Sequence, residues 1–477
     1  MFDETVPVIE INRLNLDRLW TYLQLSVKRA DFIAVDLELS GLGNFSHLRD
    51  KPFQERYARI RESVQTRSIL SIGLALFYLE KGRNETGDEK VIKMSCRVFN
   101  ITTMAARPFT VEPAALKFLS KHGFDFNKLI ETAIPYELKN LENPLCQLWE
   151  TVLFSGASVI FHNGFLDLAF LYNHLFCELP EQVSNFQSCV CDWFENPEII
   201  SESDKERVGG RGLFYDNKYI AAVDGLQATF LEYVFRKYQR MNLNEHKAGR
   251  ICLDIKFNVQ AGKNKLIEDD IDFVDCTMSA QFLRNDFSIN KETLESICDH
   301  YSSNGCCKTI NCQKAHEVDL ILDIECYQIQ KKQNKQKRKH EHTTKDNPDS
   351  KAKSRPLPSS IVQQINEDEE MEETESTISD NSGISYEKTH FSTRGCHRAG
   401  MDAFMTGFGT LFSQRVHIFK NGTLDPKLAN KTTSPGLEKP LPFIRSTYSP
   451  PSERHQELWD FLSRKKIEAV KMKSGIQ

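Results

Sequence analysis

Short apolar runs with the character of β-strands alternate with helical patterns over residues 6–235. Residues 32–35 and 69–77 have strand character, whereas residues 16–27 and 165–175 space their apolar side chains as amphipathic helices do. Strands that come first and are followed by βα units form a sheet covered by helices. The alternation therefore predicts a sheet domain of the α/β or α+β class.

Composition limits the kinds of protein that this chain can be. Its 477 residues are 40% hydrophobic, which is enough for two or three domains with a sizeable core. The formal net charge is -5, so any contact with phosphate must come from local basic patches. The longest apolar run is too short to cross a bilayer, and the N-terminus lacks the apolar centre of a secretory signal. We expect a soluble intracellular protein without a membrane partner, whose cysteines are metal ligands or thiols rather than disulfides.

Two acids follow the apolar run 32–35 at a spacing of two residues. Side chains alternate along a strand, so Asp36 and Glu38 should point to the same face. Neighbouring carboxylates raise one another's pKa unless a cation lies between them, and oxygen ligands suit magnesium or manganese. A solvated strand end explains the same pattern, and Asp-x-Glu alone is too common to decide between the two.

Two further acidic signals lie far along the chain. Asp167 falls in the first turn of a predicted helix after a His-Asn-Gly turn, where the helix dipole favours a carboxylate. An ordinary capping aspartate is the alternative there. His397 precedes Asp402 by five positions with small residues between them, and the alternative is a surface segment after a disordered linker.

The ordered set Asp-x-Glu, Asp and His-x4-Asp resembles the DEDD exonuclease superfamily in its histidine subtype. Residues 66–75, 98–101 and 215–219 look like the CAF-type deadenylase branch, closest to its nuclear members with an embedded CCCH zinc finger. Residues 54–57 also look like the related poly(A)-specific ribonuclease. The resemblance covers roughly residues 5–412, interrupted by low-complexity sequence.

The resemblance implies an RNase H-like fold, with a mixed central sheet flanked by helices, and two Mg²⁺ or Mn²⁺ ions. It implies that Asp36 bridges the ions, that Glu38 and Asp402 complete the shell of the first, and that Asp167 holds the second. It also implies that His397 is the general base. The expected activity is 3′-to-5′ exoribonucleolytic trimming of single-stranded RNA with an adenosine-rich 3′ end, in nuclear 3′-end processing. The alternatives are a catalytically weak RNA-binding adapter acting through the finger and a DNA 3′ exonuclease.

The chain departs from the family pattern in two ways. Leu39-Ser40-Gly41 stands where most members have Phe-Pro-Gly, and a long insertion separates Asp167 from Asp402. A second stretch, residues 246–251, begins like the third motif but has Ile251 where the acid should stand. We therefore assign the third motif to His397 and Asp402.

A cluster of Cys and His residues lies within the insertion. Cys298, Cys307, Cys312 and His316 have the spacing of a structural CCCH zinc site that holds one Zn²⁺. Cys306 also fits as the second ligand, and scattered thiols without metal are the simpler alternative. The finger could bind single-stranded RNA or serve only a structural or protein-binding role.

A basic run follows the Cys and His residues. Its six cations are Lys331, Lys332, Lys335, Lys337, Arg338 and Lys339. A nuclear import signal is the favoured interpretation, and a solvated linker is the alternative. We accordingly predict location in the nucleus, including a subnuclear body, with the import machinery and nuclear RNA-processing proteins as partners.

These patterns predict five segments along the chain. Residues 1–290 form the main part of the nuclease domain, 291–320 the zinc finger, and 321–392 a disordered linker that carries the basic run. Residues 393–415 complete the nuclease domain with the third motif, and 416–477 form a mostly irregular tail.

Overall fold

The computed structural model describes residues 5–43, 51–80, 90–194, 212–285, 289–307, 309, 311–343, 398–433 and 439–474. The His397 side chain, which the sequence analysis assigned as general base, lies outside these residues. Among the described residues, every helix is too short or too polar to span a membrane.

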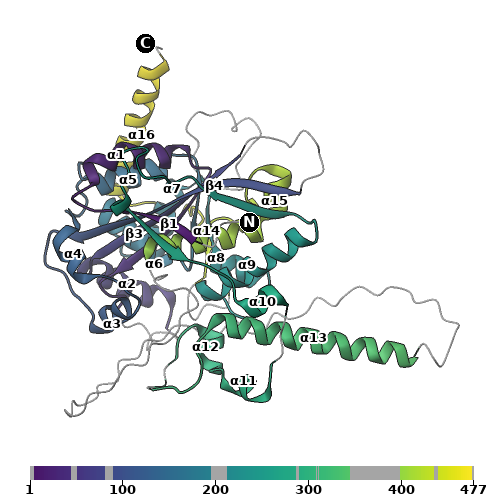
Figure 1. The fold of residues 1–477 in the computed structure, drawn as a ribbon. Coiled ribbons are helices and arrows are strands. Elements are labelled where there is room, and N and C mark those ends of the chain that lie inside the picture. Colours follow the sequence, from purple (N-terminus) through teal and green to yellow (C-terminus); the bar gives the residue numbers. More distant parts are fainter. Residues whose placement is uncertain are drawn as a thin grey trace.

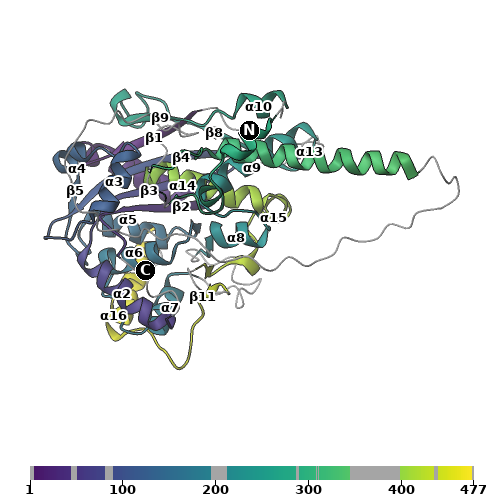
Figure 2. The same ribbon diagram turned by 90° about the horizontal axis from the view of Figure 1, so that it is seen from below.

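A nine-stranded mixed sheet forms the centre of the molecule (Figure 1). The strands are β1 (Thr5–Ile11), β2 (Phe32–Leu39), β3 (Ile69–Leu79), β4 (Val91–Ala105), β5 (Ile134–Tyr136), β6 (Ser158–Phe161), β7 (Phe214–Asp216), β8 (Cys252–Phe257) and β9 (Ile271–Asp275). Their order is β7-β6-β2-β3-β4-β1-β9, with β5 and β8 also paired to β4, and Figure 2 shows β1, β4, β3 and β2 lying in this order. β2–β3, β3–β4 and β1–β9 are antiparallel, while β1–β4, β2–β6 and β6–β7 are parallel. The predicted mixed sheet flanked by helices is confirmed.

Helices cover both faces of the sheet. One face packs against α1 (Leu16–Arg29), α2 (Phe53–Thr66), α5 (Pro144–Leu153), α6 (Phe165–Leu175) and α7 (Val183–Trp193). The other face packs against α8 (Asn217–Val223), α9 (Leu231–Lys247), α14 (Ala399–Ser413) and α15 (Arg415–Asn421). Two short helices, α3 (Pro113–Lys121) and α4 (Phe126–Thr132), share a small core near the end of β4.

Strand β2 is buried on both faces because its side chains alternate between two cores. Ile33, Val35 and Leu37 join the core under α1 and α5, whereas Phe32 and Ala34 join the core under α14. Asp36 continues the second series and therefore faces α14.

Helix α14 returns from the long insertion and lies across the middle of the sheet. All its residues from 399 to 412 are buried, and it contacts β2, β3 and β4. A helix that is apolar all round must be buried, which explains why this segment crosses the core rather than its surface.

The insertion is more ordered than the sequence analysis predicted. It contains α10 (Ala280–Arg284), α11 (Lys291–Ser296), α12 (Asp299–Asn304) and α13 (Val318–Thr343), together with the 3-10 turn η3 (Glu268–Asp270). The prediction of a disordered linker from residue 321 is wrong as far as residue 343, because these residues belong to helix α13. This helix projects from the body of the molecule (Figures 1 and 2). Val318 and Leu322 anchor the start of this helix in a buried cluster, and the following Lys, Gln and Arg residues are strong helix formers. Residues 344–397 lie outside the described part of the chain.

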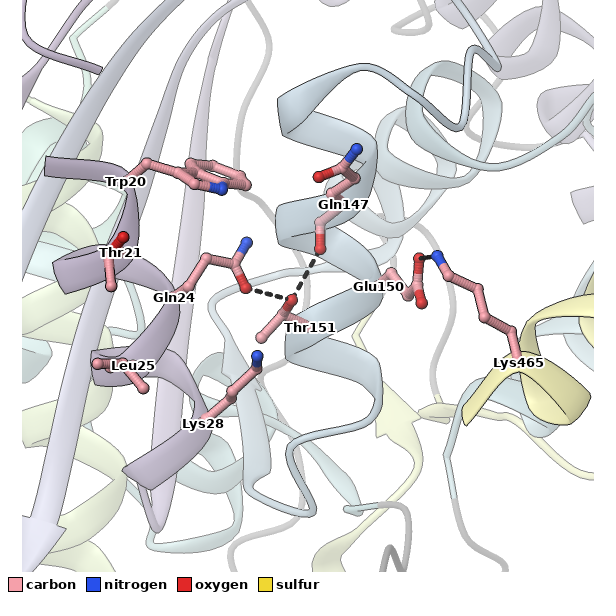
Figure 3. Close-up of a pocket in the computed structure, with 9 residues that line it drawn as sticks. All are labelled: Trp20, Thr21, Gln24, Leu25, Lys28, Gln147, Glu150, Thr151 and Lys465. Atoms are coloured by element: carbon pink, nitrogen blue, oxygen red, sulfur yellow. Dashed lines mark hydrogen bonds and ion pairs between the residues drawn. The ribbon is translucent and has the colours of Figure 1, made fainter. Parts of the chain in front are cut away.

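The described part of the tail, residues 416–433 and 439–474, consists largely of helices and short strands, which differs from the mostly irregular segment predicted for 416–477. It contains α15, η4 (Pro426–Leu428), β10 (Lys431–Thr432), β11 (Leu441–Pro442) and α16 (Glu453–Ser474). His455, Leu458, Trp459 and Leu462 follow helical spacing and pack one face of α16 on the sheet domain. Lys465 Nζ lies 3.0 Å from Glu150 Oε2 of α5, beside a groove shared with α1 (Figure 3). The sequence predicts only a short helix around residues 457–462 here, because apolar residues are few along the rest of α16.

Candidate active site

Three carboxylates from two distant segments meet on the face of the sheet that α14 covers. One oxygen from each of Asp36, Glu38 and Asp402 lies within 4.8 Å of the others. Strand alternation brings the first two side by side on β2, and the first turn of α14 supplies the third. The structure thus brings together three of the four acids assigned from the sequence.

The fourth acid, Asp167, lies in the first turn of α6 and reaches the same strand. Its carboxylate accepts a hydrogen bond from the backbone of Leu37, the residue between the two acids of β2. The charge of Asp167 also acts on Asp36, although it is not part of the group of three. Asp167 therefore lies at the edge of the acid cluster, which we define as Asp36, Glu38, Asp167 and Asp402.

Burial and mutual repulsion disfavour the ionised form of these acids. Burial, and then the charges of the three neighbouring acids, raises the pKa of Asp36 well above its ordinary range. Burial is also the main cause that raises the pKa of Asp167 to about 7. Such a cluster is stabilised by bound cations, and its donors are all oxygens, which fits magnesium or manganese better than zinc.

The loop that follows Glu38 is held by a pair of residues that sequence reasoning missed. Glu112 accepts hydrogen bonds from the backbone N–H groups of Leu42, at 3.2 Å, and Gly43, at 2.8 Å. Arg67 Nε donates to the same carboxylate at 2.6 Å. This loop contains the Leu-Ser-Gly that replaces Phe-Pro-Gly, so Glu112 and Arg67 fix its shape. No local signal marks them, because Glu112 lies about 70 positions from the loop.

Asp216 fixes the turn that precedes Asp167. This buried side chain accepts hydrogen bonds from the N–H groups of Asn163, at 3.0 Å, and Gly164, at 3.2 Å. It also accepts a hydrogen bond from Thr432 of the C-terminal segment. Burial lowers the pKa of His162 in the same turn to about 3, so this imidazole is neutral.

The stretch 246–251 has no part in the cluster. Residues 246 and 247 end α9, and Gly249 adopts a φ of 63° that terminates the helix. Residues 246–251 contain no acid, and among the described residues it is Asp402 that joins Asp36 and Glu38.

A second group of ligand side chains lies in the insertion. Ligand atoms of Cys298, Cys307, Cys312 and His316 all lie within 4.8 Å of one another, and we call this group the Cys/His cluster. Cys306 is outside it, and its carbonyl oxygen lies 3.0 Å from His300 Nδ1. Nε2 of His316 is buried and has no hydrogen-bond partner among the described residues, which fits a metal ligand. The geometry favours Cys307 over Cys306 as the second ligand.

Ion pairs attach the segment behind the Cys/His cluster to the sheet domain. Arg240 of α9 pairs with Asp319, at 2.9 Å, and with Asp323, at 2.7 Å, on α13. Arg236 pairs with the same Asp319 at 2.5 Å. The Phe230 ring, at the start of α9, packs against Tyr301, which stacks on His316. The cluster is therefore fixed to α9 by both apolar and ionic contacts.

Comparison with known proteins identifies relatives of the sheet domain. A family model described as CAF1 family ribonuclease matches residues 11–147 and 142–409. The poly(A)-specific ribonuclease PNLDC1 of Mus musculus is 35% identical over 123 residues, which cover 24% of this chain and 22% of that protein. The poly(A)-specific ribonuclease PARN of Danio rerio is 27% identical over 150 residues, which cover 30% of this chain and 22% of that protein. The chain thus matches about a fifth of the length of these relatives.

Among solved structures, the Mg²⁺- and Mn²⁺-bound form of Pop2p from Schizosaccharomyces pombe matches with a TM-score of 0.34 and 19% sequence identity. The match covers 49% of this chain and 82% of that one.

The family match spans most of the chain and includes β2, α6 and α14, which carry the four acids. The resemblance inferred from the motifs is confirmed at this level. The chain belongs to the CAF1 ribonuclease family.

Proposed function

We propose that this protein is a metal-dependent 3′-to-5′ exoribonuclease that removes adenosine-rich 3′ tails from RNA. The observation that carries the proposal is the meeting of Asp36, Glu38 and Asp402 within 4.8 Å, with Asp167 beside them. Membership of a ribonuclease family supports the reaction, and two relatives named poly(A)-specific ribonuclease support the adenosine-rich substrate.

The four acids would hold two Mg²⁺ or Mn²⁺ ions. Bound there, the ions would supply an activated water and neutralise the leaving 3′ oxygen. Glu38 and Asp402 orient their carboxylates toward Asp36, and the Leu37 N–H orients Asp167 toward the same strand. The loop fixed by Glu112 and Arg67 borders the cluster, where it would limit how the terminal nucleotide enters.

His397 is the general base in this proposal. It immediately precedes Arg398, which begins the described segment that leads into Asp402. An imidazole with an ordinary pKa can accept the proton of the attacking water near neutral pH. A Gln at this position would keep hydrogen-bonding capacity but lose the proton acceptor.

The direct test is a 3′-end assay on fluorescent oligonucleotides with the full-length chain. The proposal expects Mg²⁺-dependent shortening of an RNA that ends in adenosines, slower shortening of a uridine-ended RNA, no shortening of matched DNA, and none in EDTA. The Asp402→Asn variant serves as the inactive control. Equal rates on RNA and DNA would contradict the substrate and favour a DNA exonuclease. RNA binding without shortening would favour an adapter.

We also propose that the Cys/His cluster binds one Zn²⁺ and that the protein acts in the nucleus. Within the family, the protein would be most closely related to the nuclear branch with an embedded CCCH finger. The import machinery would recognise the basic run from Lys331 to Lys339. Fluorescent fusions test this part: changing the six Lys and Arg residues to Ala should move the protein from nucleus to cytoplasm. Unchanged nuclear location would contradict the import role and leave the nuclease proposal standing.

A further inference from the structure

A polar row crosses the sheet beneath the start of α14. The strand register pairs Asp36 of β2 with Gly73 of β3, Gly73 with Asn100 of β4, and Asn100 with Glu10 of β1. Directly paired residues present their side chains on the same face, and here that face is the one that α14 covers.

The next row on the same face has a different character. It consists of Ala34, Ala75, Val98 and Val8, paired in the same strand order, and all four are apolar. Beneath α14 the polar groups of the sheet therefore gather at the start of the helix, and the row on the far side of it, Glu38, Ser71 and Thr102, is also polar. Farther along, the helix packs mostly on apolar side chains, apart from a hydrogen bond that Thr410 Oγ1 donates to Asn217 Oδ1 of α8 at 3.2 Å. Such a localised set of polar groups needs an explanation, because burial of polar groups is costly unless they are hydrogen-bonded.

The first turn of α14 is bonded to the middle of the polar row. The Gly400 N–H donates to Asn100 Oδ1 at 3.2 Å. Ser71 Oγ donates to the same oxygen at 2.9 Å, and Asn100 Nδ2 donates to Glu10 Oε2 at 3.0 Å. The amide of Asn100 is thus oriented on both sides, with its oxygen directed at the helix.

Gly73 provides the space for this contact. A Cβ atom at position 73 would lie 1.8 Å from the carbonyl oxygen of Ala399 and 2.5 Å from the backbone nitrogen of Gly400. The backbone of α14 therefore rests directly on β3, and no side chain larger than hydrogen fits between them.

The two ends of the polar row, Glu10 and Asp36, contact residues on either side of Gly400. At one end, Arg398 Nη1 lies 3.5 Å from Glu10 Oε1 and also pairs with Asp272 of β9. At the other end, Asp402 meets Asp36 and Glu38. The Asp402 N–H donates to the Arg398 carbonyl at 2.9 Å, so one helical turn spans the row.

We infer that Gly73, Asn100 and Arg398 are positioning residues that set the register of α14 and thereby bring Asp402 into the acid cluster. The inference rests on the proposed metal-dependent function. Apolar packing alone leaves α14 free to slide by a turn, because cores tolerate rearrangement at constant volume. Directional hydrogen bonds and an ion pair at one end remove that freedom. A short loop would itself restrict where a helix can lie on the sheet. Helix α14 follows a long insertion, so its position depends more on these directional contacts.

The inference is tested by Mn²⁺ binding to the full-length, zinc-loaded protein, measured by titration calorimetry alongside thermal unfolding. Gly73→Ala and Asn100→Ala should each weaken Mn²⁺ binding about 10- to 100-fold, the usual loss when groups that orient metal ligands are removed. Asn100→Ala creates no clash, so it keeps the test informative if Gly73→Ala does not fold.

The matched control is Gly407→Ala, on the same helix. A Cβ there would lie 2.3 Å from the Phe77 ring, which crowds the core without touching the first turn. It should lower the melting temperature but leave Mn²⁺ affinity within about twofold, because additivity holds for separate sites. Parent-like Mn²⁺ affinity in Asn100→Ala, or an equal loss in Gly407→Ala, would overturn the inference. A parent protein that binds no more Mn²⁺ than Asp36→Asn would instead overturn the proposed function, and the inference with it.

Discussion

The acid cluster and the Cys/His cluster are both groups of ligand side chains, but the two regions around them are built differently. The acid cluster lies on a sheet with an extensive apolar core on each face. The Cys/His cluster lies among short helices with a much smaller core. The difference teaches that the first region can fold around its apolar side chains and would gain the proposed ions afterwards, whereas the second would depend on the proposed zinc ion to fold.

The two clusters also differ in how their charges affect folding. Without cations, the four carboxylates repel one another, so the sheet domain is folded in spite of its site. The three thiols and the imidazole form a small closed set, and the zinc ion proposed to bind there would supply much of the stability of the segment around it. Losing a ligand should therefore have opposite consequences for stability in the two places.

The largest effect is expected from Asp36→Asn. It should lower turnover on adenosine-tailed RNA about 10³-fold or more, because groups that act as a unit fail together. Burial and the neighbouring acids raise the pKa of Asp36, so its ionisation opposes folding at neutral pH. The metal-free variant should consequently melt at the parental temperature or above it in differential scanning calorimetry. A drop of many degrees would mean that Asp36 is a structural residue.

The Cys/His cluster should respond in the opposite sense. Cys307→Ser should lose the bound zinc and expose residues 289–316 to hydrogen exchange, while the strands of the sheet stay protected. Cys306→Ser is the matched control and should keep one zinc per chain, since Cys306 lies outside the cluster. Plasma mass spectrometry of zinc content distinguishes the two. Zinc loss from Cys306→Ser with retention in Cys307→Ser would reverse the assignment.

A smaller effect is expected where the two regions join. Arg240→Ala leaves Asp323 buried without its main partner and should destabilise the α9–α13 contact by about 3–5 kcal/mol. Local hydrogen exchange of α13 reports this loss. The exposed pair of Lys314 with Asp299 provides a control, and Lys314→Ala should change stability by less than about 1 kcal/mol. Equal effects of the two substitutions would show that the ion pairs of α9 do not hold the Cys/His segment.

The smallest effect is a pH dependence confined to the metal-free sheet domain. The pKa of Asp167 is raised from 3.8 to about 7, chiefly by burial, so the folded state binds this proton more tightly than the unfolded state. The stabilisation is complete below pH 3.8 and is lost as the pH rises to about 7, so this group lowers the melting temperature across that window. Asp167→Asn should remove this component. An identical pH profile in the parent and this variant would contradict the assignment.

The sequence predicted the parts of the site that depend on local patterns. Strand alternation was enough to place Asp36 and Glu38 on one face, and the family resemblance identified Asp167 and Asp402. The polar row could not be predicted, because Gly73, Asn100 and Glu10 come together through the register of three strands. Thr432 was missed for a related reason, since its bond to Asp216 joins positions 216 residues apart.

Order beyond residue 320 was predicted poorly, and the reasons are physical. In α13 a few apolar residues fix the first turns and helix-forming cations extend them, which composition alone does not distinguish from a charged linker. In α16 one apolar stripe, with Trp459 stacked on Phe154, anchors a segment rich in charged residues. The predicted boundaries of the nuclease and finger segments and the role of His397 remain predictions.

The most direct test of the whole account is anomalous diffraction at the manganese edge from crystals grown with Mn²⁺. The account predicts a peak within coordination distance of the carboxylates at positions 36, 38 and 402, and a second peak toward position 167. Strong peaks elsewhere with none beside Asp36 would contradict it, because the proposed nuclease function requires these distant acids to converge on shared cations.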